Sequence, residues 1–566
     1  MDSDWFTLRK GKRLSALFFV VNLYYWCYAA YILLVTLLGA LAMWLLEPNG
    51  AFTFPKAFYM AAACVSQSGL AVVDWSKQAN TTYSISFALI VLGSAPLLHM
   101  VPVFLRRNAF KMQAKLADKM YGSTTAEVRR MVDHDPASPK RQRSFSEPQL
   151  DRLAMQWQEA QSKGTGSSTL FPKATQKAKS GGKVRRMLGE RYRLEYVALT
   201  MVLKIMLGYW IIVHVTAALI FFCYFEFGEG EIQDKFREEQ YHSHWHAIYL
   251  TTSAFQNNGL VLTPSSVMDF AKSPLLLNTI GALVLLGNTC LPIMIRLIAY
   301  VMARLSRVGS ENRAALGFLL EHPRRCFTHM FPATHTLWLL LVVVILNVAC
   351  MLVIMWQDWD SVALNGLSVM DKVWNAFFQA VSTRTAGLNS VNIADLSQGT
   401  TFLMAIMMYL ASTPTVVVMR FSAAAGTELD ITGRVEGLEE DVLKGNNSVK
   451  SQARRYLTQD STALVIIVFL ICVFEKTSFE KSSLLSSPDS DGIYGDFSFF
   501  KVLFEVASAY GTCGLSLGFE NQAASFSYVW CEGSQFLLCI VMILGRLRGL
   551  PDSIDPSVRV AMTKGD

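Results

Sequence analysis

The chain has 566 residues, of which 52% are apolar and 17% are charged, and its formal net charge at pH 7 is +7. An ordinary soluble domain contains about 25% charged residues, so this composition argues against a soluble enzyme and indicates a protein that crosses a membrane several times. The ten cysteines form no C-x-x-C pair, which argues against a zinc site and a disulfide framework.

Six segments reach the length of about 20 apolar residues that a helix needs to cross the hydrocarbon core of a bilayer. In chain order they are residues 14–46, 85–105, 205–225, 275–295, 336–356 and 402–419. Two shorter uncharged runs, 461–474 and 533–545, are weaker candidates by hydropathy alone. Lys and Arg residues flank the start of the first segment and the ends of the second and fourth, so both termini are expected in the cytoplasm.

A basic stretch separates the second and third segments. Residues 105–193 contain 20 Lys or Arg and 8 Asp or Glu, and therefore carry a local charge of +12. Large apolar residues are few there, which predicts a largely disordered cytosolic linker that is attracted to anionic lipid. Within it, "RSFSEP" fits a kinase site and the pattern of a 14-3-3 ligand, with Ser146 as the phosphate acceptor, unless the motif is incidental in a Ser-rich linker.

An internal repeat gives the clearest indication of architecture. The segments "FYMAAACVSQSGLAVVD", "IYLTTSAFQNNGLVLTP", "AFFQAVSTRTAGLNSVN" and "LFEVASAYGTCGLSLGF" each pass from an apolar run through small polar residues to Gly-Leu. The four glycines are Gly69, Gly259, Gly387 and Gly514, spaced by 190, 128 and 127 residues, and the basic linker accounts for the longer first interval. Each unit is interpreted as a span, a short re-entrant helix, a glycine loop and a second span.

Because the fourth unit needs a helix on either side of its loop, the repeat indicates that the two weak segments are also spans. It predicts an all-α integral membrane protein. Four helix–pore-loop–helix units, with eight transmembrane helices, are expected around a single central pore, because irregular backbone at membrane depth is tolerated where it lines a water-filled cavity. Backbone carbonyls replace the hydration shell of a cation at such loops, and glycine permits the required positive φ. The negative C-terminal ends of the short helices also favour a cation.

The predicted selectivity filter consists of the four residues that end at each repeat glycine. These residues are Ser66, Gln67, Ser68 and Gly69; Gln256, Asn257, Asn258 and Gly259; Arg384, Thr385, Ala386 and Gly387; and Gly511, Thr512, Cys513 and Gly514. Arg384 is expected to brace its loop from behind rather than to face the ion. Asn80 begins an N-glycosylation sequon on the predicted outer side.

With these loops in view, the chain resembles the Trk/Ktr/HKT superfamily of potassium transporters, and most of all its fungal Trk type. The resemblance also rests on "LGNTCLPIMIR", on "FLLEHPRRCFTHMFPATHTLWLL" and on "SAYGTCGLSLGF" followed by "LGRLRGLPDSID". The linker after the second span is much shorter than the one usual in the fungal group. The resemblance implies potassium uptake at the plasma membrane by a homodimer that has one pore in each chain.

The resemblance also implies roles for particular residues. In the superfamily, glycine at the first-loop filter position accompanies potassium selectivity and serine accompanies sodium permeation, and Gly69 matches the glycine. A gate below the filter matches Ser412, Thr413 and Pro414, where the proline interrupts a helix, together with Arg546. No cofactor is implied, and the bound metal is K+ held by the carbonyls of the filter.

Other functions stay open from the sequence. A sodium-permeable protein of the same superfamily, or a symporter of K+ with Na+ or H+, would have the same loops. A membrane receptor or enzyme is a more distant alternative, and no H-E-x-x-H or Walker motif supports an enzyme. Nothing suggests a nucleic-acid partner; the expected surroundings are the lipid bilayer.

The predicted domain order is a pore unit at 1–106, the linker at 107–190, a second pore unit at 191–304, a connector at 305–335, a third pore unit at 336–421, a connector at 422–456, a fourth pore unit at 457–548 and a cytosolic tail at 549–566.

Overall fold

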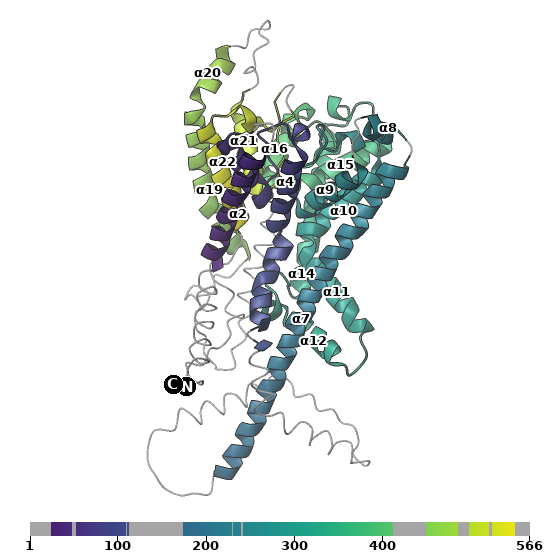
Figure 1. Ribbon diagram of the computed structural model, residues 1–566, viewed down its shortest axis with the longest axis vertical. Coiled ribbons are helices and arrows are strands. Elements are labelled where there is room, and N and C mark those ends of the chain that lie inside the picture. The colour runs from purple at the N-terminus through teal and green to yellow at the C-terminus, as the bar shows by residue number, and fades with distance from the viewer. Residues whose placement is uncertain are drawn as a thin grey trace.

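The structure is a computed structural model of the chain. It describes residues 24–47, 52–108, 110–111, 174–228, 230–238, 242–410, 449–484, 497–519 and 523–548. This part of the chain is mostly helical, and no β-strand occurs within it. Figure 1 shows an elongated bundle in which helices from all parts of the chain lie side by side in the upper half.

Three single helices in the described residues are long and apolar enough to cross a membrane: α2 (Tyr24–Leu46), α7 (Ala174–Phe227) and α14 (Ala333–Gln357). They expose large apolar side chains outward, among them Leu38 (58% exposed), Ile212 (65%) and Leu341 (56%). Continuous apolar surface of this kind is stable against lipid rather than against water.

Three further candidate spans are each divided by a bend. Helix α4 (Asn80–Leu92) meets the helix Ala95–Asn108 at 46°, and α19 (Val449–Phe474) meets α20 (Lys476–Leu484) at 64°. In the third, α10 (Pro274–Val284) runs into the π-helical turn η3 (Leu285–Thr289), and α11 (Leu291–Leu305) follows at 87°. Proline near the start of α11 and the π turn are both recognised causes of such a bend.

Four shorter helices precede the four repeat glycines, as the sequence predicts: α3 (Phe54–Ser66), α9 (Ser243–Gln256), α15 (Val369–Thr385) and α21 (Phe499–Gly511). Their last two turns are buried, and a short 3-10 helix follows each loop. These are η1 (Trp75–Lys77), η2 (Met268–Phe270), η5 (Ile393–Asp395) and η6 (Phe526–Val529). Figure 1 shows α9, α15, α16 (Gln398–Leu410) and α21 gathered in the upper part of the bundle.

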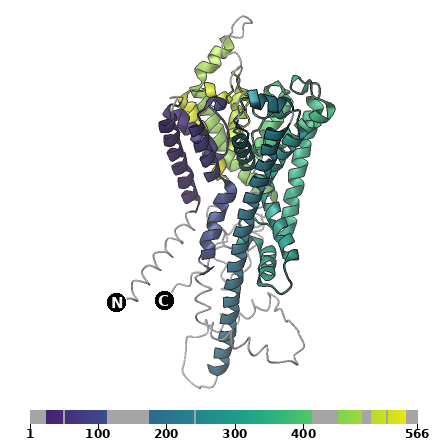
Figure 2. The same cartoon turned by 45° about the vertical axis from the view of Figure 1, so that its right-hand side comes forward.

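The remaining helices complete the bundle and its lower side. They are α8 (Glu231–Glu238), α12 (Glu311–Glu321), α13 (Pro323–Cys326), η4 (Val362–Leu364) and α22 (Glu532–Leu547). Figure 2 shows the first part of α7 projecting below the other helices. An ion pair between Arg193 and Glu311, with Nε and Oε1 2.8 Å apart, ties α7 to α12.

The predicted spans overlap helices wherever the structure describes them, but their boundaries differ by several residues. The end predicted at residue 295, for example, lies inside α11, which continues to Leu305. The two runs that hydropathy marks as weak, 461–474 and 533–545, fall inside α19 and α22. The largest difference is at α7, which begins at Ala174, within the range 107–190 that the sequence predicts as linker. Residues 112–173 of that range lie outside the described residues.

Glycines in the segments that follow three of the loops allow close approach to the end of a short helix. A Cβ atom built on Gly93, Gly287 or Gly545 would overlap the backbone carbonyl oxygen of Val65, Phe255 or Tyr510, respectively. Each of these carbonyls belongs to the residue four positions before a repeat glycine. The segments that contain these glycines therefore pack directly on the last turns of α3, α9 and α21.

We expect Gly287→Ala to destabilise the protein by about 1–3 kcal/mol, as overpacking of a core does, because its methyl group has no room beside the Phe255 carbonyl. The thermal unfolding midpoint of detergent-purified protein measures the effect. Gly208→Ala on α7 is the matched control, since a Cβ there meets nothing within 4 Å and helix propensity favours alanine. Equal midpoints for the two variants would contradict the close packing.

Candidate functional site

The four repeat glycines all adopt left-handed backbone conformations. Their φ angles are +65° at Gly69, +88° at Gly259, +67° at Gly387 and +98° at Gly514. Such angles are accessible to glycine without the steric penalty that a Cβ imposes. The backbone angle at each of these positions thus favours glycine.

The four loops also meet one another in a closed ring. A Cβ atom on each glycine would lie no more than 2.5 Å from the carbonyl oxygen of the residue that precedes the glycine of the next loop. The pairs are Gly69 with Asn258, Gly259 with Ala386, Gly387 with Cys513, and Gly514 with Ser68. The order runs from the first loop to the fourth and returns to the first, so segments separated by hundreds of residues share one axis.

Three of the loops leave their helices in the same way. Gln67, Asn257 and Thr512 adopt φ angles of 61°, 58° and 50°, and the N–H of the following residue donates to a carbonyl five positions back. The N–O distances are 3.0 Å for Ser68 to Ala63, 2.9 Å for Asn258 to Ser253 and 3.0 Å for Cys513 to Ser508. This is the Schellman pattern of helix ends, built here with residues other than glycine.

The third loop departs from this pattern. Helix α15 continues to Thr385, Ala386 stays in the right-handed region, and the N–H groups of Ala386 and Gly387 both donate to the Ser382 carbonyl, at 2.9 and 3.3 Å. The Ser382 hydroxyl holds the next residue of the loop: it donates to the Leu388 carbonyl at 2.6 Å and accepts from the Leu388 N–H at 2.8 Å. Sequence reasoning missed Ser382.

Side chains of the loops bond to neighbouring helices and, in one case, to the next loop. Gln67 Nε2 donates to the Ile90 carbonyl at 3.3 Å. The Asn257 amide, oriented so that its nitrogen donates to the Val284 carbonyl at 3.2 Å, accepts from Thr385 Oγ1 at 3.0 Å. Arg384 is only 3% exposed in the last turn of α15. The close contacts within the ring are therefore made by backbone groups.

Hydrogen bonds above the ring join the loops in pairs. Ala71 N–H donates to Ser525 Oγ at 2.8 Å and Ser525 N–H returns a bond to the Ala71 carbonyl at 2.8 Å, so the first loop is tied to the fourth. Asn389 N–H donates to Ser266 Oγ at 3.1 Å and Val267 N–H to the Asn389 carbonyl at 3.2 Å, which ties the third loop to the second. Ser525 and Ser266 were not predicted.

The outer end of the first loop carries a charged pair. Asp74 caps η1 by accepting from Ser76 N–H at 3.2 Å, and its Oδ2 lies 2.8 Å from Lys77 Nζ. Partial burial raises the pKa of Asp74, but hydrogen bonds from Lys77 and Ser76 outweigh this effect and hold the pKa below its ordinary value. Asp74 is therefore ionised at neutral pH.

Two arginines near the end of α22 are held by neighbouring elements. Arg546 Nη2 donates to the carbonyl of Gly93, at the bend that follows α4. Arg548 Nη1 donates to the Tyr409 carbonyl at 3.2 Å, and its guanidinium carbon lies 4.5 Å from the centre of the Tyr510 ring. Arg546 therefore links the fourth unit to the first, and Arg548 links it to α16.

The other predicted sites are placed only in part. Asn80 is the first residue of α4 and is exposed. Ser412, Thr413 and Pro414 of the predicted gate, and the predicted phosphate acceptor Ser146, lie outside the described residues.

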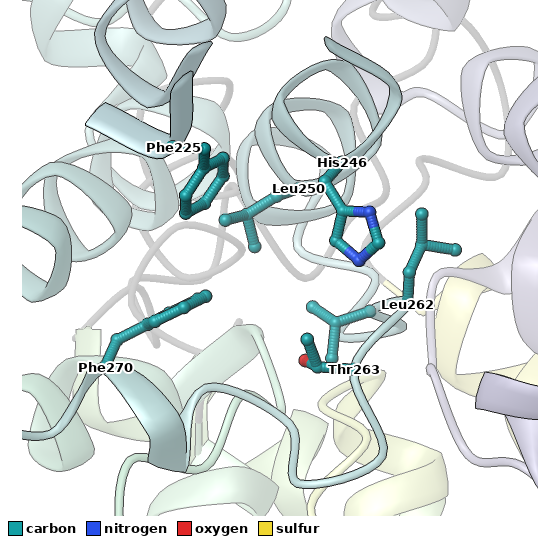
Figure 3. A pocket seen from close by; sticks show the side chains of 7 residues that line it. Phe225, His246, Leu250, Leu262, Thr263 and Phe270 are labelled. Carbon is teal, nitrogen blue, oxygen red and sulfur yellow. The ribbon is translucent and has the colours of Figure 1, made fainter. Parts of the chain in front are cut away.

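A small apolar pocket lies beside the second loop. Figure 3 shows His246 and Leu250 of α9 facing Phe225, Phe270 and Thr263 across it. Its lining contains none of the ring glycines. Across the described ranges, no group of three or more His, Cys, Asp and Glu side chains is arranged to hold a metal ion. Within this part of the chain, the ring of backbone groups is thus the strongest candidate site.

Comparison with known proteins gives a family match. The model of the TrkH family, described as cation transport protein, matches residues 182–563, which include the second, third and fourth loops. The chain is 33% identical over 317 residues to the potassium transporter TRK1 of Candida albicans, covering 56% of this chain and 29% of that protein. It is 32% identical over 375 residues to potassium transport protein 1 of Schizosaccharomyces pombe, covering 66% of this chain and 42% of that protein.

A solved structure also matches. The crystal structure of the potassium transporter TrkH from Vibrio parahaemolyticus is 12% identical, with a TM-score of 0.46, over 93% of this chain and 83% of that one. The chain spans less than half the length of the two curated fungal relatives.

Proposed function

Since the chain belongs to the TrkH family of cation transport proteins, we propose that it takes up potassium across the plasma membrane through the ring of four loops. The observation that carries the proposal is the closed cycle of positive-φ glycines, in which each glycine adjoins a carbonyl of the next loop. The fungal relatives are named as potassium transporters rather than as enzymes, in agreement with this substrate.

The chemistry of the ring suits a monovalent cation. Carbonyl oxygens directed at the axis replace water around the ion without a fixed charge that would hold it too tightly. The negative ends of the dipoles of α3, α9, α15 and α21 adjoin the ring and lower the energy of a cation there. Arg384 is the charged residue of the predicted filter, and its burial in the last turn of α15 fits a bracing role.

Eight spans follow from this proposal. They are α2, α4 with the helix Ala95–Asn108, α7, α10 with α11, α14, α16, α19 and α22. The short helices α3, α9, α15 and α21 enter the bilayer without crossing it, and a water-filled cavity accommodates their irregular loops. Both termini lie in the cytoplasm, and two chains form a homodimer in which each has its own pore.

The membrane potential is a sufficient driving force. One elementary charge gains about 2.3 kcal/mol per 100 mV, which corresponds to roughly 50-fold accumulation at equilibrium. We therefore propose a uniporter with a channel-like pore. Coupling to Na+ or H+ would appear as a reversal potential that follows those ions as well as K+.

The proposal predicts that the full chain restores growth and K+ influx at low external potassium in cells that lack their own uptake systems. Patch-clamp reversal potentials, measured while K+, Na+ and pH are varied separately, identify the transported and any coupled ion. Protein that reaches the cell surface but carries no K+ current would contradict the proposed function.

Gly69→Ser is expected to lower the permeability of K+ relative to Na+ about tenfold, equivalent to about 1.4 kcal/mol, because its Cβ must displace the Asn258 carbonyl. Bi-ionic reversal potentials measure the ratio independently of expression. Gly518→Ser is the matched control: it has a similar φ of +64°, but the nearest atom to its Cβ is 4.0 Å away. Unchanged selectivity in Gly69→Ser, or an equal change in the control, would remove the assignment.

Arg546→Ala is expected to increase K+ flux per transporter severalfold. A unit charge about 4 Å from a permeating ion costs up to about 4 kcal/mol at an effective dielectric constant near 20, so its removal lowers the barrier below the filter. Flux is normalised to surface protein, with Arg304→Ala, an exposed arginine of α11, as control. An equal or lower flux at normal expression would count against a barrier at Arg546.

A further inference from the structure

Two side chains cross from one filter loop to the helix of the preceding unit. Asn258 Nδ2 in the second loop donates to the Ala63 carbonyl at 3.2 Å and to the Cys64 carbonyl at 3.4 Å, at the end of α3. Cys513 Sγ in the fourth loop lies 3.6 Å from the Ser382 carbonyl and 3.1 Å from the Thr383 carbonyl, at the end of α15. Both side chains are fully buried.

Each crossing side chain reaches the carbonyl that already shapes the neighbouring loop. The Ala63 carbonyl accepts from the N–H groups of Ser68 and Gly69, at 3.0 and 3.4 Å. The Ser382 carbonyl does the same for the third loop, through Ala386 and Gly387. A displacement of either carbonyl therefore moves the filter backbone directly.

The direction of the Asn258 amide is fixed by its surroundings. The nitrogen faces two carbonyl oxygens, which accept hydrogen bonds, and Oδ1 accepts no bond within the described residues. Reversal of the amide would place three oxygens against one another. The position thus selects a donor of asparagine size.

The crossing side chains are two of the contacts that join neighbouring units around the ring. Asn258 joins the second unit to the first, and Cys513 joins the fourth to the third. The other two junctions, between the fourth and first units and between the second and third, are joined above the ring by Ser525 and Ser266. All four junctions around the ring are therefore bridged, with a further side-chain bond of 3.0 Å from Thr385 Oγ1 to the Asn257 amide between the second and third units.

We propose that Asn258 is a positioning residue for the discrimination between K+ and Na+, which acts on the first loop through the Ala63 carbonyl, and that Cys513 is its weaker counterpart for the third loop. This inference rests on the proposed function and deepens it. Discrimination needs carbonyls held at a spacing that suits one ion, and the crossing amide restrains the loop that contains Gly69. A thiol is a weak donor, so the Cys513 contact restrains its loop less.

The test compares Asn258→Ala and Asn258→Asp with the wild type in bi-ionic reversal potentials. Asn258→Ala removes the donor, and we expect the permeability ratio of K+ to Na+ to fall about threefold. Asn258→Asp keeps the size but turns a carboxylate toward two carbonyl oxygens, and we expect a fall of about tenfold. If the aspartate variant does not reach the surface, the alanine variant decides.

Asn389→Ala is the matched control, an asparagine of the third loop whose backbone, but not side chain, bonds to its neighbour in the described residues. Its ratio is expected to stay at the wild-type value. Combined with Gly69→Ser, the Asn258→Ala change is expected to be less than additive, because both act on the first loop, whereas Asn389→Ala adds nothing. Cys513→Ala is expected to lower the permeability ratio of K+ to Na+ less than threefold, and Cys513→Ser is expected to keep the wild-type ratio.

Wild-type ratios in both Asn258 variants would overturn the inference and leave the proposed function standing. An equal loss in Asn389→Ala would also overturn it, since any disturbance of the loops would then suffice. A wild type that reaches the surface without K+ current would overturn the proposed function and this inference together.

Discussion

The close approach of four backbones at one axis is the constraint on which the rest of the structure depends. Each repeat glycine adjoins a carbonyl of the next loop, so no side chain fits there. Beneath the ring, Gly93, Gly287 and Gly545 bring the segments that follow three of the loops against the carbonyls of the short helices. Two of these segments bend near Gly93 and Gly287, where they pack on helices that end inside the bundle.

The repeat could be recognised from the sequence because it depends on the local backbone conformation of each loop. A positive φ beside the carbonyl of the next loop needs glycine, and the small polar residues before it suit a buried helix end whose carbonyls need donors. That local signal, repeated four times, predicted helices at 461–474 and 533–545, which hydropathy alone marks as weak, and the structure has α19 and α22 there. The same signal identified the four glycines that the structure brings together at the ring.

The contacts between repeats were not readable, because they join residues that the sequence sets far apart. Ser525 and Ala71 are 454 positions apart, and Asn258 and Ala63 are 195 positions apart. No sequence pattern at such separations indicates that two residues are in contact. The different conformation of the third loop could not be predicted for another reason. Ala386 aligns with Ser68, Asn258 and Cys513, yet its helix continues one residue further and Ala386 stays in the right-handed region. The bend of 87° depends likewise on packing around η3.

The junction between the fourth and first units is fixed on both sides of the ring. Above it lie the bonds of Ser525 with Ala71 and a contact of 2.8 Å between Tyr59 Oη and Ser527 Oγ. Below it, Arg546 donates to Gly93, whose own Cα lies against the end of α3. Arg546 therefore holds the bend after α4 on one side of the ring, while the bonds of Ser525 hold the loops on the other.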